Sequence, residues 1–120
     1  MGNFDFELGK LLENHPDNRM AFEYYMTSLL LEKNLAAFTS NINRLKNYGY
    51  KEIPVLYEEA LLLCISNKKK IIIPEGYSIR ESTVKLFTDY SKINSSLHGN
   101  PVQTLSKLYG KTYWFYWQFN

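Results

Sequence analysis

The sequence predicts an all-α fold. Apolar residues recur at helical spacing along almost the whole chain of 120 residues, and no segment makes a convincing sheet. Proline and glycine residues interrupt this pattern at intervals that divide it into six or seven helices. Seven Phe, ten Tyr and two Trp residues, 16% of the chain, favour a well-packed core over disorder.

The first two predicted helices lie on either side of Pro16. The apolar stripe of the first consists of Phe4, Leu8, Leu11 and Leu12. This helix ends before Pro16 because a residue that precedes proline avoids the helical conformation. The second helix begins near Asp17 or Asn18, either of which can cap it, and carries apolar residues up to Leu31. It is apolar around most of its circumference, so we expect it to pack on several sides.

The third and fourth helices have clear boundaries. Lys33–Asn34 forms a short turn, and Gly49 is well placed to end the third helix in the left-handed conformation. The stripe of the third helix consists of Leu35, Phe38, Ile42 and Leu45. Pro54 suits the first position of the fourth helix, which is apolar on most sides and extends through Ile65.

An irregular insertion is expected at residues 67–78. The three lysines 68–70 fit a helix C-terminus, where cations complement the helix dipole. Residues 71–74 are interpreted as an extended buried segment, and Glu75–Gly76 as a turn. Ser78 and Glu81 have the spacing of a capping box, which predicts that the fifth helix begins at Ser78.

The last third of the chain continues the helical pattern. The stripe of the fifth helix consists of Ile79, Thr83, Leu86, Tyr90, Ile93 and Leu97. Asn100 and Pro101 supply the cap and first position of a short sixth helix, which Gly110 closes. Residues 113–119 contain six aromatic residues and form either a last helical turn or an extended strap.

Composition and charge exclude several classes of protein. Fourteen basic against twelve acidic residues give a net charge of +2, too weak a field to indicate a nucleic-acid or anionic-membrane partner. A single Cys excludes an intramolecular disulfide framework and a Cys-based metal site. No apolar run approaches the roughly 18–20 residues that span a bilayer. We therefore interpret residues 1–120 as one soluble domain.

The segment from Arg19 to Leu45 resembles one tetratricopeptide repeat. The residues that match its packing positions are Phe22, Tyr25, Met26 and Leu29, followed by Phe38, Ile42 and Leu45. The match is degenerate, because Phe38 stands where that family has a small residue and Lys33 where it has glycine. The resemblance implies antiparallel helix pairs stacked as a tetratricopeptide-like right-handed solenoid, with the insertion at 67–78 as an irregular connection.

A longer resemblance covers most of the chain. Its segments are His15–Ala21, Arg44–Leu45 with Gly49–Tyr50, Ile53–Pro54, Tyr57–Leu61 and Thr112–Tyr116. In these segments the chain resembles the C-terminal region of an uncharacterised Bacteroidetes family, in which a multi-spanning membrane portion precedes a tetratricopeptide-like helical domain. The resemblance implies a parent protein in the bacterial inner membrane, on an unknown side, and it brings no established activity.

Residue types that could carry catalysis favour structural interpretations. His15 and His98 are 83 residues apart in turn regions, without further ligands at short spacing. Cys64 lies in an apolar helix, which favours a buried structural thiol. Glu58 and Glu59 point about 100° apart on a helix, so we interpret them as a solvated helix face. We predict no catalytic residue, no metal ligand and no cofactor.

Two surfaces are candidates for recognition. If the tetratricopeptide outline holds, Glu23, Thr27 and Glu58 line a partner groove. The aromatic tail offers the second surface, with Tyr113, Trp114, Tyr116 and Trp117. These residues either cap the open hydrophobic end of the solenoid or form a docking surface, and both hold if a Trp faces outward.

The leading functional hypothesis is a non-catalytic protein-interaction or scaffolding domain that recognises a peptide or helix on a preformed helical surface. One alternative is a structural cap that packs on the membrane portion of its own parent chain. Another is a substrate-binding accessory domain of an enzyme. The expected partner is a protein or peptide, with neither nucleic acid nor a small-molecule substrate.

Overall fold

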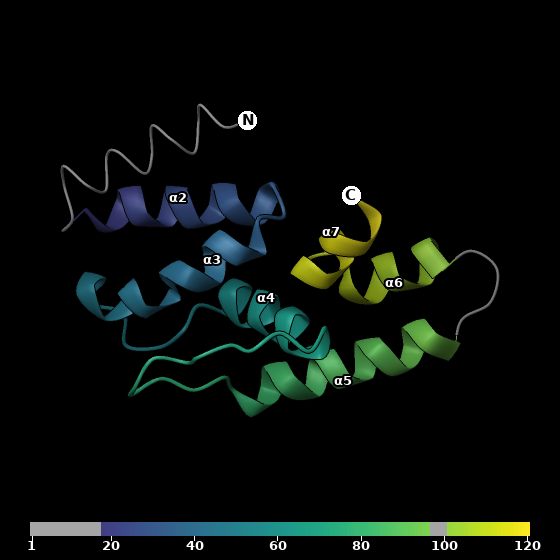
Figure 1. Ribbon diagram of the computed structural model, residues 1–120. Coiled ribbons are helices and arrows are strands. Elements are labelled where there is room, and N and C mark those ends of the chain that lie inside the picture. Colours follow the sequence, from purple (N-terminus) through teal and green to yellow (C-terminus); the bar gives the residue numbers. More distant parts are fainter. Residues whose placement is uncertain (1–17, 97–100) are drawn as a thin grey trace. The chain divides into compact units, whose positions relative to one another are not determined.

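The computed structural model describes residues 18–96 and 101–120. Over these residues the chain forms six α-helices and one 3₁₀ helix, without a strand, so the all-α prediction is confirmed (Figure 1). The helices are α2 (Arg19–Leu31), α3 (Leu35–Asn41), η1 (Ile42–Tyr48), α4 (Val55–Ser66), α5 (Glu81–Ser96), α6 (Pro101–Tyr109) and α7 (Tyr113–Phe119). The first predicted helix and both histidines lie outside the described residues.

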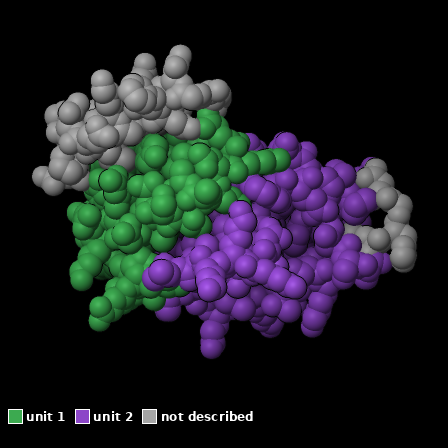
Figure 2. Space-filling model, viewed as in Figure 1, with its two compact units in different colours: residues 1–52, 73–77 green, residues 53–72, 78–120 purple. Residues whose placement is uncertain are grey.

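The chain divides into two compact units, coloured separately in Figure 2. Unit 1 comprises residues 1–52 and 73–77, of which residues 18–52 and 73–77 are described. Unit 2 comprises residues 53–72 and 78–120 and therefore contains α4 to α7.

In unit 1 the predicted boundaries of α2 are confirmed. The side chain of Asn18 accepts a hydrogen bond of 3.0 Å from the backbone N–H of Ala21, which identifies Asn18 as the N-cap. Lys33 adopts a left-handed conformation with φ of 61°, and Asn34 caps α3 through the N–H of Ala37. The Lys33–Asn34 turn thus reverses the chain between two helices that contact each other.

The third predicted helix changes its winding midway. It is α-helical in α3 and then tightens into the 3₁₀ helix η1, which ends at Gly49 with φ of 75° as expected. The side chains of Thr39, Ser40 and Asn41 all bond back to carbonyl oxygens of the preceding turn. Such bonds compete with the regular helical ladder and account for a change of winding at this point.

The core of unit 1 lies between α2 and the α3–η1 segment. The rings of Phe22 and Tyr48 stack with centroids 4.4 Å apart. The other buried side chains of these helices include Met26, Leu29, Leu30, Leu35, Phe38, Ile42 and Leu45. The apolar circumference of α2 is buried only in part, because Met20, Tyr24 and Leu31 are 66%, 60% and 55% exposed.

In unit 2 the four helices contact one another in a closed cycle. Helix α4 contacts α5 and α7, and α6 contacts the same two helices (Figure 1). Pro54 lies one residue before the start of α4, and Pro101 is the first residue of α6. Gly110 ends α6, where a Cβ would lie 2.5 Å from the carbonyl oxygen of Ser106, so this close approach requires glycine.

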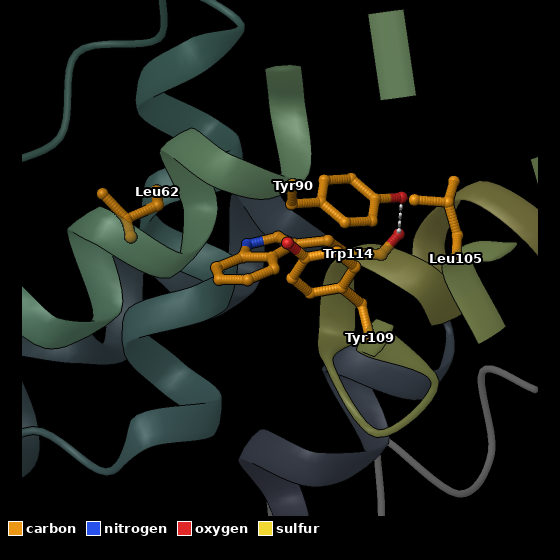
Figure 3. Packing of buried hydrophobic residues seen from close by; sticks show 5 residues of the cluster. All are labelled: Leu62, Tyr90, Leu105, Tyr109 and Trp114. Atoms are coloured by element: carbon orange, nitrogen blue, oxygen red, sulfur yellow. Dashed lines mark hydrogen bonds between the residues drawn. The ribbon is translucent and has the colours of Figure 1, made fainter. Parts of the chain in front are cut away.

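The core of unit 2 is rich in aromatic rings. Its buried cluster consists of Leu62, Tyr90, Leu105, Tyr109 and Trp114. Figure 3 shows the rings of Tyr90, Tyr109 and Trp114 gathered together, with the Tyr90 hydroxyl directed at the carbonyl oxygen of Trp114. The rings of Tyr90 and Tyr109 meet edge to face at 5.1 Å, one of the geometries that aromatic pairs prefer.

Two predictions about residues 67–81 are wrong. Residues 71–74 are non-helical, but Ile72 is 85% exposed, so this segment is not buried. The fifth helix begins at Glu81 and not at Ser78. The predicted turn at Glu75–Gly76 is confirmed, with Gly76 at φ of 89°.

Candidate functional site

Glu58 of α4 anchors the first turn of α5. Its Oε2 accepts a hydrogen bond of 2.8 Å from the backbone N–H of Arg80, the residue just before α5. Its Oε1 accepts a hydrogen bond of 2.8 Å from the hydroxyl of Thr83. A carboxylate at a helix N-terminus satisfies free N–H groups and complements the dipole, so α5 begins where Glu58 reaches it.

Arg80 provides the charge that balances this buried carboxylate. Its Nε lies 3.5 Å from Oε2 of Glu58, and its Nη2 donates to the backbone carbonyl oxygen of Ile53. The Glu58 side chain is fully buried, whereas that of Arg80 is 38% exposed. Glu58 is therefore held on one side by a helix terminus and on the other by a guanidinium group.

The neighbouring Glu59 anchors α7 in the same way. Its Oε1 accepts a hydrogen bond of 2.9 Å from the backbone N–H of Tyr113, the first residue of α7. Burial raises the pKa of the Glu59 carboxyl, the Tyr113 hydrogen bond opposes this rise, and the charge of Glu58 adds to it. The interpretation of Glu58 and Glu59 as a solvated helix face is wrong, because each supports the N-terminus of a different helix.

Helix α7 is fixed along its inward side by further bonds. Thr112 is its N-cap and accepts a hydrogen bond from the N–H of Phe115. The indole Nε1 of Trp114 donates a hydrogen bond of 2.8 Å to the backbone carbonyl oxygen of Glu59. Residues 113–119 thus form a helix and not an extended strap.

The four aromatic residues predicted as a capping or docking surface divide into two pairs. Tyr113 and Trp114 are buried, and burial strongly raises the pKa of the Tyr113 hydroxyl. Tyr116 and Trp117 are half-buried. Phe115 and Phe119 pack against the core cluster of unit 2. Half of the set therefore closes the core, and the other half remains accessible.

An open cavity of about 430 Å³ lies beside the accessible edge of α7. Its lining comes from α4, α5 and α7 and consists, among the described residues, of Leu63, Ser66, Phe87, Tyr90, Ser91, Asn94, Trp114, Trp117 and Gln118. The Tyr90 hydroxyl donates to Oε1 of Gln118, and Nε2 of Gln118 donates to Oδ1 of Asn94 at 2.9 Å. Three side chains from two helices thus form a hydrogen-bonded chain along one wall.

The apolar pattern of the sequence predicted Tyr90 on the α5 wall of this cavity but not Phe87, Ser91 or Asn94. The predicted stripe placed Leu86 inward, but Leu86 is 41% exposed, and Phe87 packs against the core instead. Phe87, Ser91 and Asn94 have i, i+4, i+7 spacing and share a helix face. On α7, Trp114, Trp117 and Gln118 have i, i+3, i+4 spacing and likewise share one helix face. The rest of the described stripe of the fifth helix is confirmed, since Thr83 and Tyr90 are buried and Ile79 and Ile93 pack against the core.

The predicted groove residues belong to different units. Glu23 and Thr27 of α2, in unit 1, both line a second hollow of about 350 Å³, together with Met20 and Tyr24. Glu58 belongs to unit 2, where its side chain is buried. Its carboxylate is engaged within the core and does not line an exposed wall.

Glu23 already has partners inside unit 1. Its Oε1 accepts hydrogen bonds from the Tyr50 hydroxyl at 2.7 Å and from Nε of Arg19 at 3.2 Å. The guanidinium carbon of Arg19 lies 4.0 Å from the Tyr50 ring centroid. The Tyr50 hydrogen bond lowers the pKa of the Glu23 carboxyl, with a further contribution from Arg19.

Three further features bear on function: the thiol of Cys64, groups that could bind a metal ion, and helices that could span a membrane. Cys64 is buried as predicted, and burial raises the pKa of its thiol. Within the described ranges, no group of three or more His, Cys, Asp or Glu residues is placed to hold a metal ion. None of the helices in those ranges is long and apolar enough to cross a membrane.

Over residues 18–96 and 101–120, fold and site together define an all-helical protein with an aromatic-walled cavity in unit 2. Over residues 1–120 the chain matches a family of unknown function, DUF6057, and it belongs to that family. No curated protein and no solved structure matches the chain.

Proposed function

We propose that the chain is a non-catalytic protein-interaction domain that recognises a peptide or helix on the preformed surface of unit 2. The observation that carries this proposal is the dual anchoring of α7 by Glu59, through its carboxylate and its backbone carbonyl. Rigid aromatic walls bind partners without the entropic cost of ordering themselves, and Trp and Tyr are enriched at binding hot spots.

The chemistry of the cavity supports binding over catalysis. Among the described lining residues, Tyr90 is the only titratable side chain, and burial raises the pKa of its hydroxyl. The other lining groups are aromatic, aliphatic, amide and hydroxyl. Such groups bind and orient a partner, whereas acid–base catalysis uses groups whose pKa lies near the working pH.

Our proposal also includes the tetratricopeptide-like stacking of the helix pairs and the membrane location of the parent protein. The α2–α3 contact and the α4–α5 contact each provide a helix pair of the kind that tetratricopeptide-like solenoids stack. We propose such a stack, in a parent protein of the bacterial inner membrane. A crystal structure in which the two pairs superpose by a screw rotation would support the stack, and fractionation of the full-length parent tests its location.

A selection from a display library of random linear peptides tests the interaction proposal. The immobilised 120-residue chain is the bait, with Trp117→Ala as the site variant and Leu108→Ala as its matched control. Leu108 is 59% exposed on α6 and does not line the cavity. We expect enriched peptides whose affinity falls at least tenfold with Trp117→Ala and less than twofold with Leu108→Ala. No enrichment, or equal binding to Trp117→Ala, would refute the proposal.

A further inference from the structure

The hydrogen-bonded chain along the cavity wall orients two carboxamides, those of Gln118 and Asn94. Because Gln118 accepts from Tyr90 through Oε1, its Nε2 is turned toward Asn94. Asn94 in turn accepts through Oδ1, so its Nδ2 group is also oriented. That Nδ2 donates to no acceptor among the residues that the structure describes. Asn94 therefore presents N–H donors beside a carbonyl oxygen that retains a second lone pair.

This donor–acceptor pair matches one particular chemical group. A primary carboxamide presents an N–H and a C=O on the same side, as the backbone N–H and C=O of one extended residue do, so the two can pair as residues of neighbouring antiparallel strands do. The half-buried rings of Trp117 and Phe87 belong to the same lining and offer surfaces for another ring. The cavity thus combines a place for an aromatic side chain with a place for a backbone amide.

Charge narrows the range of partners further. No Lys, Arg, Asp or Glu occurs among the described residues that line the cavity. A free chain terminus, a phosphate group or a charged side chain would find no countercharge among these lining residues. The lining therefore suits an uncharged segment from the interior of a chain.

We propose that the cavity binds an internal, uncharged, extended peptide segment, whose aromatic side chain packs against Trp117 and Phe87 while the backbone N–H and C=O on either side of one of its Cα atoms pair with the Asn94 carboxamide. This proposal rests on the proposed function of unit 2 in peptide recognition. It specifies which segments are recognised and by which atoms.

N-acetyltryptophanamide is the minimal probe, since it carries one aromatic ring between two uncharged peptide groups. Its binding to the full 120-residue chain is followed by amide and indole NMR shifts. We expect shifts at the Trp117 indole N–H and the Asn94 side-chain amide. Binding should be at least tenfold weaker for 3-methylindole, which lacks peptide groups, for N-acetylalaninamide, which lacks the ring, and for N-acetyltryptophan, which carries a charge.

Two variants test whether the Asn94 carboxamide and the Trp117 ring contact the bound probe. Asn94→Asp is nearly isosteric, so it preserves packing, but it replaces the N–H donors with a charged oxygen. Trp117→Ala removes the ring. Each should weaken binding of N-acetyltryptophanamide at least tenfold, whereas Leu108→Ala should change it less than twofold. A dispersed amide spectrum for each variant verifies folding, and Asn94→Asp alone decides the result if Trp117→Ala does not fold.

Three results would overturn the inference. These are the absence of a Trp117 shift with N-acetyltryptophanamide, equal binding of 3-methylindole, or stronger shifts at this site with the neutral sugar methyl glucoside. The peptide selection separates this failure from that of the proposed function. If N-acetyltryptophanamide fails to bind but the selected peptides still require Trp117, unit 2 recognises peptides through a different chemistry, and only the further inference is refuted. If the selection also yields no peptide that requires Trp117, both proposals are refuted.

Discussion

The indole nitrogen of Trp114 lies 2.8 Å from the backbone carbonyl oxygen of Glu59, to which it donates a hydrogen bond. The carboxylate of the same glutamate accepts from the N–H of Tyr113. One residue of α4 thus holds two consecutive residues of α7. Since Glu58, its neighbour, holds the start of α5, two adjacent acidic residues position both aromatic walls of the cavity.

Replacement of Glu58 by alanine should destabilise the fold strongly. The substitution leaves the Arg80 N–H and the Thr83 hydroxyl without their acceptor and removes the ion pair with Arg80. Unsatisfied buried donors and a lost helix cap together predict a loss of about 3 kcal/mol. Urea unfolding followed by circular dichroism measures this loss in the free energy of unfolding.

The matched control is Glu75→Ala, which removes the same group from an exposed turn. We expect a change within about 0.5 kcal/mol for this variant. Equal effects of the two substitutions would show that Glu58 does not act as a cap.

Glu59 should make stability depend on pH. Because burial raises its pKa above the ordinary value of 4.5, the folded state binds the proton more tightly than the unfolded state. The free energy of unfolding should therefore fall as pH rises from 4.5 to the raised pKa and remain level above it. Glu59→Gln keeps an acceptor for Tyr113 and removes the titration, so its profile should lack this fall.

The measurement is urea unfolding of both chains at a series of pH values, and the difference between the two curves isolates Glu59. Parallel profiles for the natural chain and Glu59→Gln would contradict the burial of an ionisable carboxyl at this position.

The two tryptophans should respond differently to the same substitution. Trp114 is 1% exposed and donates to Glu59, so Trp114→Phe should cost about 2 kcal/mol through the lost hydrogen bond and the space left behind. Trp117 is half-buried, so Trp117→Phe should cost less than about 1 kcal/mol. Thermal unfolding of the two variants measures this difference. A larger loss of stability for Trp117→Phe than for Trp114→Phe would contradict the burial of Trp114 in the core.

In unit 1 the Tyr50 hydroxyl controls the ionisation of Glu23. Tyr50→Phe removes the 2.7 Å hydrogen bond and should raise the Glu23 pKa toward 4.5, while Arg19 maintains part of the lowering. The stability that this lowered pKa provides is present above 4.5 and is lost as pH falls through the folded value.

NMR titration of the Glu23 side-chain carboxyl carbon measures this change. The control Tyr24→Phe removes a hydroxyl from an exposed ring on the same helix and should leave the Glu23 pKa unchanged. An unchanged pKa in Tyr50→Phe would mean that the hydrogen bond does not form in solution.

Local signals in the sequence predicted the helical class and several helix boundaries. Asn18, Asn34 and Gly49 act as helix boundaries through bonds to residues a few positions away, and such bonds leave a recognisable pattern. The start of α5 was misplaced because Glu58, 22 residues away, accepts from the Arg80 N–H. A cap supplied by a distant residue has no local sequence pattern.

The candidate site was predicted in part. The richness of residues 113–119 in aromatic side chains drew attention to this segment, but it left open both whether the segment is a helix or a strap and which rings face the core. That division depends on Glu59, 54 residues before Tyr113, and an acidic residue on a helix is ordinarily solvated. On α5 the predicted stripe included Tyr90, but apolar periodicity gave no reason to include the polar lining residues Ser91 and Asn94.

Hydrogen–deuterium exchange of the free chain tests most directly whether the aromatic wall is preformed by Glu59. We expect the amides of α7 to be protected in the natural chain and in Glu75→Ala, and to exchange much faster in Glu59→Ala while α4 remains protected. Exchange of α7 in the natural chain at the rate of an unstructured peptide would contradict a preformed wall, as would protection that Glu59→Ala leaves intact.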